Sequence, residues 1–233
     1  MARSQFIDNL RQASRLLAKS RPSRVGAGDV EKRSQVLLSD SNLWLTPKAV
    51  ADFDAADFAD LPPAELGTLE GDVSSFLAIA QTVSPNKPAS AAQCAKARKS
   101  LESVMRAVRK PLLSEWLAAQ RAMMQDAAAA AEGKGWYVER DEKVVTESLL
   151  GEYTAPRLTI RTNTKGVVLE PIAYFGSGRR GVVDLVQLPA YETKYLVTFQ
   201  NGRWELVSPD GRLHARPFSA SAFVNAIAHL PAS

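Results

Sequence analysis

Three side chains in the second half of the chain have types and spacing suited to metal chemistry. Asp184 lies in one expected strand, and Glu192-Thr193-Lys194 opens the next, after the turn Pro189-Ala190-Tyr191. Two carboxylates can hold Mg²⁺, and a lysine beside them can orient or polarise a water molecule. Positions 184, 192 and 194 share parity, so a hairpin in suitable register places them on one face. Asp184, Glu192 and Lys194 are therefore candidate catalytic residues, with Asp184 and Glu192 as the metal ligands.

An aspartate on one strand and Glu-x-Lys on the next resembles the PD-(D/E)XK nuclease family. The alanine-rich segment 127–131, which leads through glycine into a strand, has a similar order, and Glu147 or Glu170 would supply the additional acid. The resemblance implies Mg²⁺-dependent nuclease activity. The chain departs from the family pattern because it has no Pro-Asp pair, and because residues 199–207 predict a hairpin where the family has a helix. The competing interpretation is that these charges are solvent-facing and pair across strands.

The segment "GSGRRG", residues 176–181, matches the spacing of a dinucleotide-binding loop, but the sequence that follows predicts a strand. A dinucleotide loop must open a helix, so this function is excluded. A kinase glycine-rich loop does lie between strands, but no His-Arg-Asp or Asp-Phe-Gly follows. We expect a hairpin loop that exposes Arg179 and Arg180, and these are the candidate nucleic-acid contacts.

Few residues are available for nucleophilic or thiolate chemistry. The chain has one cysteine, Cys94, and two histidines, His214 and His229. One cysteine cannot form an internal disulfide, and its place on the apolar side of an expected helix predicts a core position. No run of 18 apolar residues predicts a membrane span. We expect a cytoplasmic protein without a cofactor, unless the nuclease alternative adds Mg²⁺.

Charge is distributed in blocks along the chain, although the net charge is only +4. Residues 1–34 carry eight Lys/Arg and three Asp/Glu, residues 35–86 carry one Lys and eight acids, and residues 87–134 carry nine bases and four acids. Neighbouring blocks of opposite sign can neutralise one another in the fold, and they also suit docking. One basic helical stretch is the second candidate nucleic-acid contact: Lys96, Arg98, Lys99, Arg106, Arg109 and Lys110.

The pattern of apolar residues changes period near Gly133–Gly135. Residues 1–134 predict four or five helices: an N-terminal amphipathic helix, one that starts at Thr46-Pro47, one after "LPP", one from Ser90 to Val108, and a last one from Pro111. The N-terminal helix has three interpretations, a packed helix, a basic contact arm or a targeting segment, of which the first is favoured.

Residues 135–233 alternate with period two and predict a strand region, which begins with two short strands in residues 135–141 and 143–148. Short turns join successive strands, including Asn201-Gly202, so they predict an antiparallel meander, followed by a helix that Ser219 caps. Aromatic residues concentrate here, either as the core of the sheet or as a base-stacking platform.

The sequence thus predicts an α+β protein with a helical region (1–134) and an antiparallel β region with a C-terminal helix (135–233). The leading hypothesis is a non-enzymatic interaction or accessory protein that docks a protein partner. The alternatives are a divergent Mg²⁺-dependent nuclease and a nucleic-acid-binding module.

Overall fold

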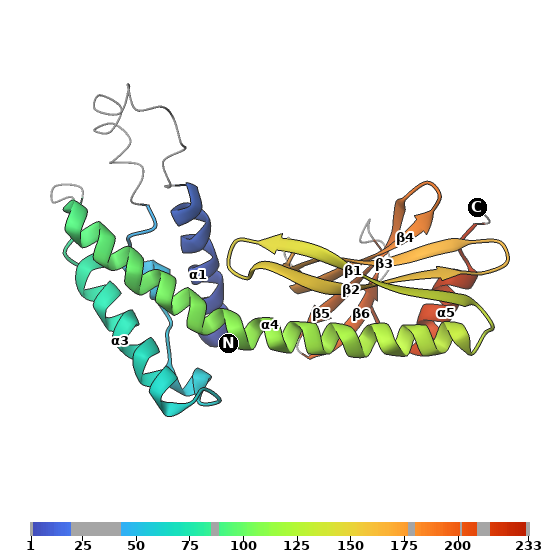
Figure 1. Ribbon diagram of the computed structural model, residues 1–233, viewed down its shortest axis with the longest axis horizontal. Helices are drawn as coiled ribbons and strands as arrows, with labels where there is room; N and C mark the ends of the chain where they lie inside the picture. Colours follow the sequence, from blue (N-terminus) through green and yellow to red (C-terminus); the bar gives the residue numbers. More distant parts are fainter. Residues whose placement is uncertain are drawn as a thin grey trace, which may run out of the picture. The chain divides into compact units, whose positions relative to one another are not determined.

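The computed structural model describes residues 2–19, 43–84, 89–176, 180–200, 202–208 and 215–231 (Figure 1). The expectations for Arg179, Asn201 and His214 lie outside these residues. The α+β class is confirmed, because long helices precede a seven-stranded antiparallel sheet and a C-terminal helix follows it. The helical elements are α1 (Ala2–Lys19), η1 (Pro47–Val50), η2 (Ala55–Phe58), α3 (Pro63–Ala80), α4 (Ala91–Glu132) and α5 (Ala220–Ala228). The strands are β1 (Tyr137–Glu147), β2 (Gly151–Arg161), β3 (Gly166–Phe175), β4 (Arg180–Leu188), β5 (Glu192–Gln200), β6 (Arg203–Val207) and β7 (Arg216–Pro217).

The chain divides into two compact units, Met1–Pro111 and Leu112–Ser233. The division falls inside α4, whereas the change of sequence period near Gly133–Gly135 marks the end of that helix and the approach to β1. The boundary between the expected helical and β regions, at residues 134–135, is therefore not the boundary between the compact units. The second half of α4 belongs to the sheet unit.

In the helical unit, α1 presents an apolar stripe to the core. Phe6, Leu10 and Leu17 are buried, as the spacing of apolar residues predicted. The ring of Phe6 lies 5.4 Å from that of Phe53 and 5.6 Å from that of Phe58, both edge-on. This interlocked aromatic packing holds α1 against the η1–η2 segment.

The helix expected from Thr46 is instead two short 3₁₀ turns, η1 and η2. Asp52 adopts a left-handed backbone conformation with φ of 64°, which ends the first turn. Asp54 then accepts a hydrogen bond from the amide of Ala56 at 2.9 Å and caps the second. The expectation of one continuous helix was wrong because these two aspartates favour turn and cap conformations.

Helix α4 begins where the sequence predicted, with Ser90 and Gln93 forming a reciprocal capping box of 3.3 and 2.9 Å. The expected break at Pro111 was wrong, because Pro111 lies inside one helix of 42 residues. Proline removes one backbone hydrogen bond, but Val108 and Leu112 on either side are buried, and this packing outweighs the local cost.

The sheet is a meander, in which each strand pairs with its neighbours in sequence, from β1 to β7. The two short strands expected in residues 135–141 and 143–148 are one strand, β1, and the short edge strand β7 had not been predicted. The second half of α4 lies along the sheet (Figure 1). The ring of Trp116, on α4, lies 5.7 Å from that of Tyr174 and 5.6 Å from that of Trp204. Ser219 accepts a hydrogen bond from the amide of Ala222 and caps α5, as predicted.

Candidate functional site

The register between β4 and β5 decides where the three nuclease candidates lie. Asp184 is opposite Leu196, whereas Glu192 is opposite Gln187, with a bulge that leaves Lys194 without a partner residue. Residues 184 and 187 of a regular strand point to opposite faces, so Glu192 does not share the face of Asp184. Lys194 Nζ contacts Glu192 Oε2 at 2.6 Å, and Asp184 accepts a hydrogen bond from Thr193 at 3.1 Å.

No cluster of three or more histidine, cysteine, aspartate or glutamate side chains suited to a metal ion occurs among the described residues. Residues of equal parity share a face only in an unbroken strand, and the extra residue in β5 changes the face for Glu192. The structure therefore brings Glu192 and Lys194 together and gives Asp184 a different partner. The catalytic assignment itself stays a prediction.

Three hydrogen-bonded groups of polar side chains lie on one face of the sheet, and the charge of Glu170 acts on the other two groups. We call these residues together the Glu170 cluster. Its members come from β1 to β5 and the β4–β5 turn: Asp141, Lys143, Arg157, Glu170, Asp184, Tyr191 and Thr193. Gly181 of β4 faces Trp116 of α4, because an added Cβ would meet its ring. Asp184 is three residues further along β4 and so points away from α4. The cluster therefore lies on the face opposite that helix.

Glu170 is the most enclosed member, with 7% of its surface exposed. Lys143 Nζ donates to its Oε1 at 2.6 Å, and the hydroxyl of Tyr191 donates to Oε2. Tyr191 has a φ of 56°, a left-handed backbone conformation that is strained for an aromatic residue. In this conformation its hydroxyl reaches Glu170. At the β1–β2 side of the cluster, Arg157 forms a two-point ion pair with Asp141.

The two central carboxyl groups have pKa values shifted in opposite directions. Burial raises the pKa of Glu170, but the hydrogen bonds and positive charges of Lys143 and its neighbours outweigh it and leave the pKa below the usual value. Burial raises the pKa of Asp184, and the charge of Glu170 raises it further, against the hydrogen bond from Thr193. Opposed pKa values are also found in acid–base pairs. Here, however, both Glu170 oxygens are engaged by side chains, which supports a structural ion-pair network.

A second network surrounds Glu147 at the end of β1. Its two oxygens accept hydrogen bonds from the backbone amides of Tyr174 and Phe175, at 2.8 and 2.9 Å. Oε1 also accepts the hydroxyl of Tyr153 at 2.5 Å, and that hydroxyl accepts the indole N–H of Trp116 at 3.2 Å. Burial and the hydrogen bond to Glu147 raise the pKa of Tyr153. The pairing of β2 with β3 covers only residues 158–161 of β2, so it does not reach Tyr174 and Phe175, and the Glu147 carboxylate accepts hydrogen bonds from their amides.

Sequence reasoning had considered Glu147 and Glu170 only as additional nuclease acids. Tyr153, six residues from Glu147, lies on the next strand, but the other partners of the two carboxylates are 21 to 28 residues away and no local spacing indicates them. Tyr191 was expected simply as a turn residue, and its contact with Glu170 depends on an unusual backbone conformation. Of the two loop arginines, Arg180 begins β4 opposite Phe175 and is half-buried.

The cationic surface of α4 is the other candidate site. Four of the six basic residues are exposed and form what we call the basic stripe: Lys96, Lys99, Arg106 and Lys110. Within the described part of the chain, none of the four has an ion-pair partner. Arg98 and Arg109 are half-buried and have interactions of their own. Among the described residues, the acidic block therefore forms no ion pair with the basic stripe.

A hollow of about 530 Å³ lies beside the β2–β3 turn, lined by Arg161, Lys165, Leu188 and Pro189 among others. The ammonium group of Lys165 donates to the carbonyl oxygens of Ile227 and Ala228, at 3.2 and 2.6 Å. Lys165 therefore caps the C-terminus of α5, so this lysine beside the hollow has a structural role.

Comparisons with known proteins give no functional assignment: no family model, no curated protein and no solved structure matches the chain. In the described ranges, no helix is sufficiently long and apolar to cross a membrane. Function must therefore be inferred from the arrangement of the chain's own residues.

Proposed function

We propose that this chain is a non-enzymatic interaction protein of the cytoplasm, which docks a macromolecular partner through the basic stripe of α4. The observation that carries the proposal is the exposure of four cations along one helix without an ion-pair partner among the described residues. A stripe that the acids of the described ranges leave unneutralised attracts an anionic surface. The sequence favoured a protein partner, whereas the basic stripe favours an anionic macromolecule of any class.

The sheet unit supports the non-enzymatic part of the proposal. Glu170, Asp141 and Glu147 are each engaged by cations, hydroxyls or backbone amides of the same unit. Residues engaged in this way hold strands together, and substrate would have to displace those bonds. The cytoplasmic assignment is supported by the single cysteine, since disulfide frameworks belong to oxidising compartments.

Elution from immobilised heparin, a generic polyanion, tests the docking surface. The test variant changes all four residues of the basic stripe to glutamine. The control changes four exposed cations elsewhere to glutamine, namely Arg15, Lys19, Lys134 and Arg203, and has the same net charge. We expect the stripe variant to elute at clearly lower salt than the control, with both variants folded by circular dichroism. Equal elution of the two variants would mean that only net charge matters, and would overturn the proposal.

A further inference from the structure

We infer that the partner of the basic stripe is a double-stranded nucleic acid, contacted at its phosphate backbone without reading of the bases. The inference rests on the proposed docking function and names the partner class for that same surface. It follows from the geometry of the stripe, from what accompanies the cations on α4, and from the strength of the available interactions.

The four cations are arranged along one line of the helix. Their spacings of three, seven and four residues keep them within about 80° around the helix axis and spread them over about 21 Å. Ser103 continues the same line midway, and the one acid between Ala91 and Lys110, Glu102, has a contact of its own within the chain. The stripe is therefore a straight row of positive charge, uninterrupted by an acid, suited to a row of phosphates.

A folded protein partner needs more than such a row. Exposed ion pairs each contribute little, and four together give an affinity no tighter than about millimolar. Protein interfaces gain their affinity from buried aromatic or aliphatic anchors. Among the described residues of the helical unit, Leu43 is the only large hydrophobic residue that is clearly exposed, and it is not on α4. The basic stripe therefore lacks the anchors that an acidic protein would require.

A nucleic acid supplies the missing driving force from its own counterions. Each phosphate that a lysine or arginine neutralises releases condensed cations, so that a few contacts suffice for measurable binding at low salt. Single strands are usually held by bases stacked on aromatic side chains. The segment from Ala91 to Lys110 contains no aromatic residue, so the stripe offers nothing to an unpaired base. These features favour a duplex, whose backbone is presented and whose bases are already stacked.

Fluorescence anisotropy with the full chain tests the inference. The probes are one short labelled duplex as DNA and as RNA, its separate single strands, a duplex of unrelated sequence, and labelled poly-glutamate. We expect both duplexes to bind with similar affinity whatever their sequence, and more tightly than the single strands or poly-glutamate. Four contacts predict a slope of about −3.6 for the logarithm of affinity against that of salt, or roughly a 100-fold loss from 50 to 200 mM.

The two glutamine variants locate the contact. The stripe variant is expected to lose at least about tenfold in duplex affinity and most of the salt dependence, whereas the charge-matched control stays within about threefold of the unchanged chain. Binding of poly-glutamate, but not of duplex, that depends on the stripe would overturn the nucleic-acid inference and leave the docking function standing. Preference for a single strand over the duplex would also overturn it. Binding of every probe equally by all three proteins would overturn both proposals.

Discussion

Glu170 and Asp184 are direct cross-strand neighbours on β3 and β4, yet the fold shifts the pKa values of their carboxyl groups in opposite directions. Lys143 and Tyr191 satisfy Glu170 and keep it ionised, whereas Asp184 is half-buried beside that negative charge with only a neutral hydroxyl, that of Thr193, bonded to it. Charged Glu170 therefore stabilises the folded state, whereas charged Asp184 destabilises it.

The first prediction is that Asp184→Asn stabilises the protein at neutral pH. The pKa of Asp184 is raised in the folded state, so the fold binds its proton more tightly than the unfolded chain does. The cost of charging it is complete above the raised pKa and absent below the unfolded value of 3.8. Asparagine removes that cost and can still accept the hydrogen bond from Thr193. Urea unfolding at several pH values should show an advantage that shrinks as pH falls towards 3.8, and a constant advantage would contradict this explanation.

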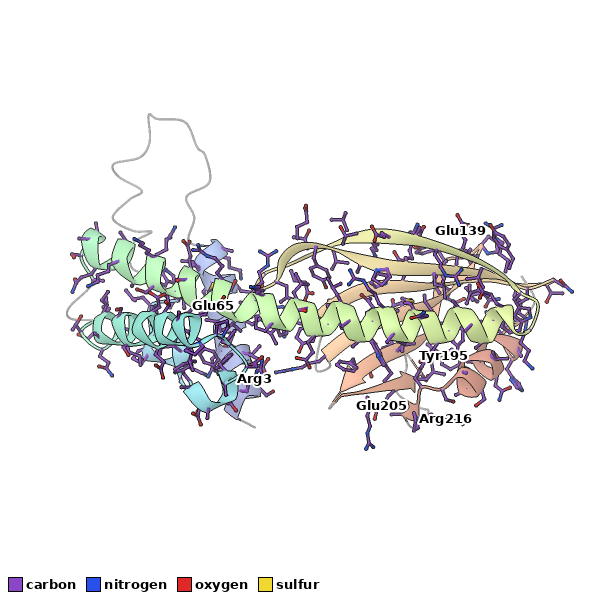
Figure 2. The ribbon with its side chains drawn as sticks, turned by 60° about the horizontal axis from the view of Figure 1, so that its bottom comes forward. Arg3, Glu65, Glu139, Tyr195, Glu205 and Arg216 are labelled. Atoms are coloured by element: carbon purple, nitrogen blue, oxygen red, sulfur yellow. The ribbon has the colours of Figure 1, made fainter. Side chains whose placement is uncertain are left out.

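The second prediction concerns the partner carboxyl group. The pKa of Glu170 is lowered, so its contribution to stability is present above the unfolded value of 4.5 and is lost as pH falls through the lowered pKa. Glu170→Gln should cost about 1–2 kcal/mol at neutral pH, because Lys143 loses its charged partner. It should also lower the pKa of Asp184, which can be followed by NMR of the side-chain carboxyl carbon. Glu139→Gln is the control, on the exposed margin of β1 (Figure 2), and should change neither quantity.

The third prediction is that Glu147→Ala destabilises the sheet unit by about 2–4 kcal/mol. The substitution removes the Glu147 acceptor from the amides of Tyr174 and Phe175 and from the hydroxyl of Tyr153. Chemical denaturation provides the measurement, and Glu142→Ala, at an exposed position of the same strand, should stay within about 0.5 kcal/mol of the unchanged chain. Equal effects of the two substitutions would show that the Glu147 hydrogen bonds contribute nothing specific.

The fourth prediction is that Gly181→Ala is severely destabilising, by about 3 kcal/mol or more. Gly181 has φ of 55°, and an added Cβ would lie 2.5 Å from the Cβ of Phe199 and 2.7 Å from the ring of Trp116. Gly67→Ala is the matched control, since no atom lies within 4 Å of its added Cβ and the residue is inside α3. That substitution should stabilise the chain by about 0.5–1 kcal/mol. Thermal unfolding of the two variants should therefore shift in opposite directions.

The fifth prediction is that labelled single- and double-stranded DNA and RNA stay intact when incubated with the protein and Mg²⁺ or Mn²⁺. Lys194 is held by Glu192, and Asp184 points to the other face of the hairpin. This geometry does not converge on a shared ion. Metal-dependent cleavage that disappears in Glu192→Ala would revive the nuclease interpretation and contradict the non-enzymatic proposal.

The sequence predicted the fold class and the order of strands because amphipathic periodicity and turn residues are local signals. It could not predict that α4 continues through Pro111, since the burial of Val108 and Leu112 outweighs the local propensity of proline. It also missed β7, whose two residues are too few to show alternation.

The candidate site was harder to predict from the sequence than the fold, because one extra residue in β5 alters the register between β4 and β5. The bulge at Lys194 places Glu192 on a different face from Asp184, and nothing in "ETKYLVTF" indicates a bulge. The backbone amides bound by Glu147 and the ammonium group bound by Glu170 lie 27 or 28 residues away in the chain, on other strands, so only the folded sheet brings them together. The basic stripe could be listed from the sequence, but only the structure separates its four exposed cations from Arg98 and Arg109.

The order of the sheet has a consequence for how the chain acquires its structure. Every strand pairs with the one before it, so each pairing closes only a short loop and costs little chain entropy. During synthesis the whole of α4 emerges before β1, and each later strand emerges after the preceding strand, with which it pairs. The meander can therefore grow one strand at a time on a helix that is present from the outset, which favours rapid folding and limits the exposure of unpaired edges to other nascent chains.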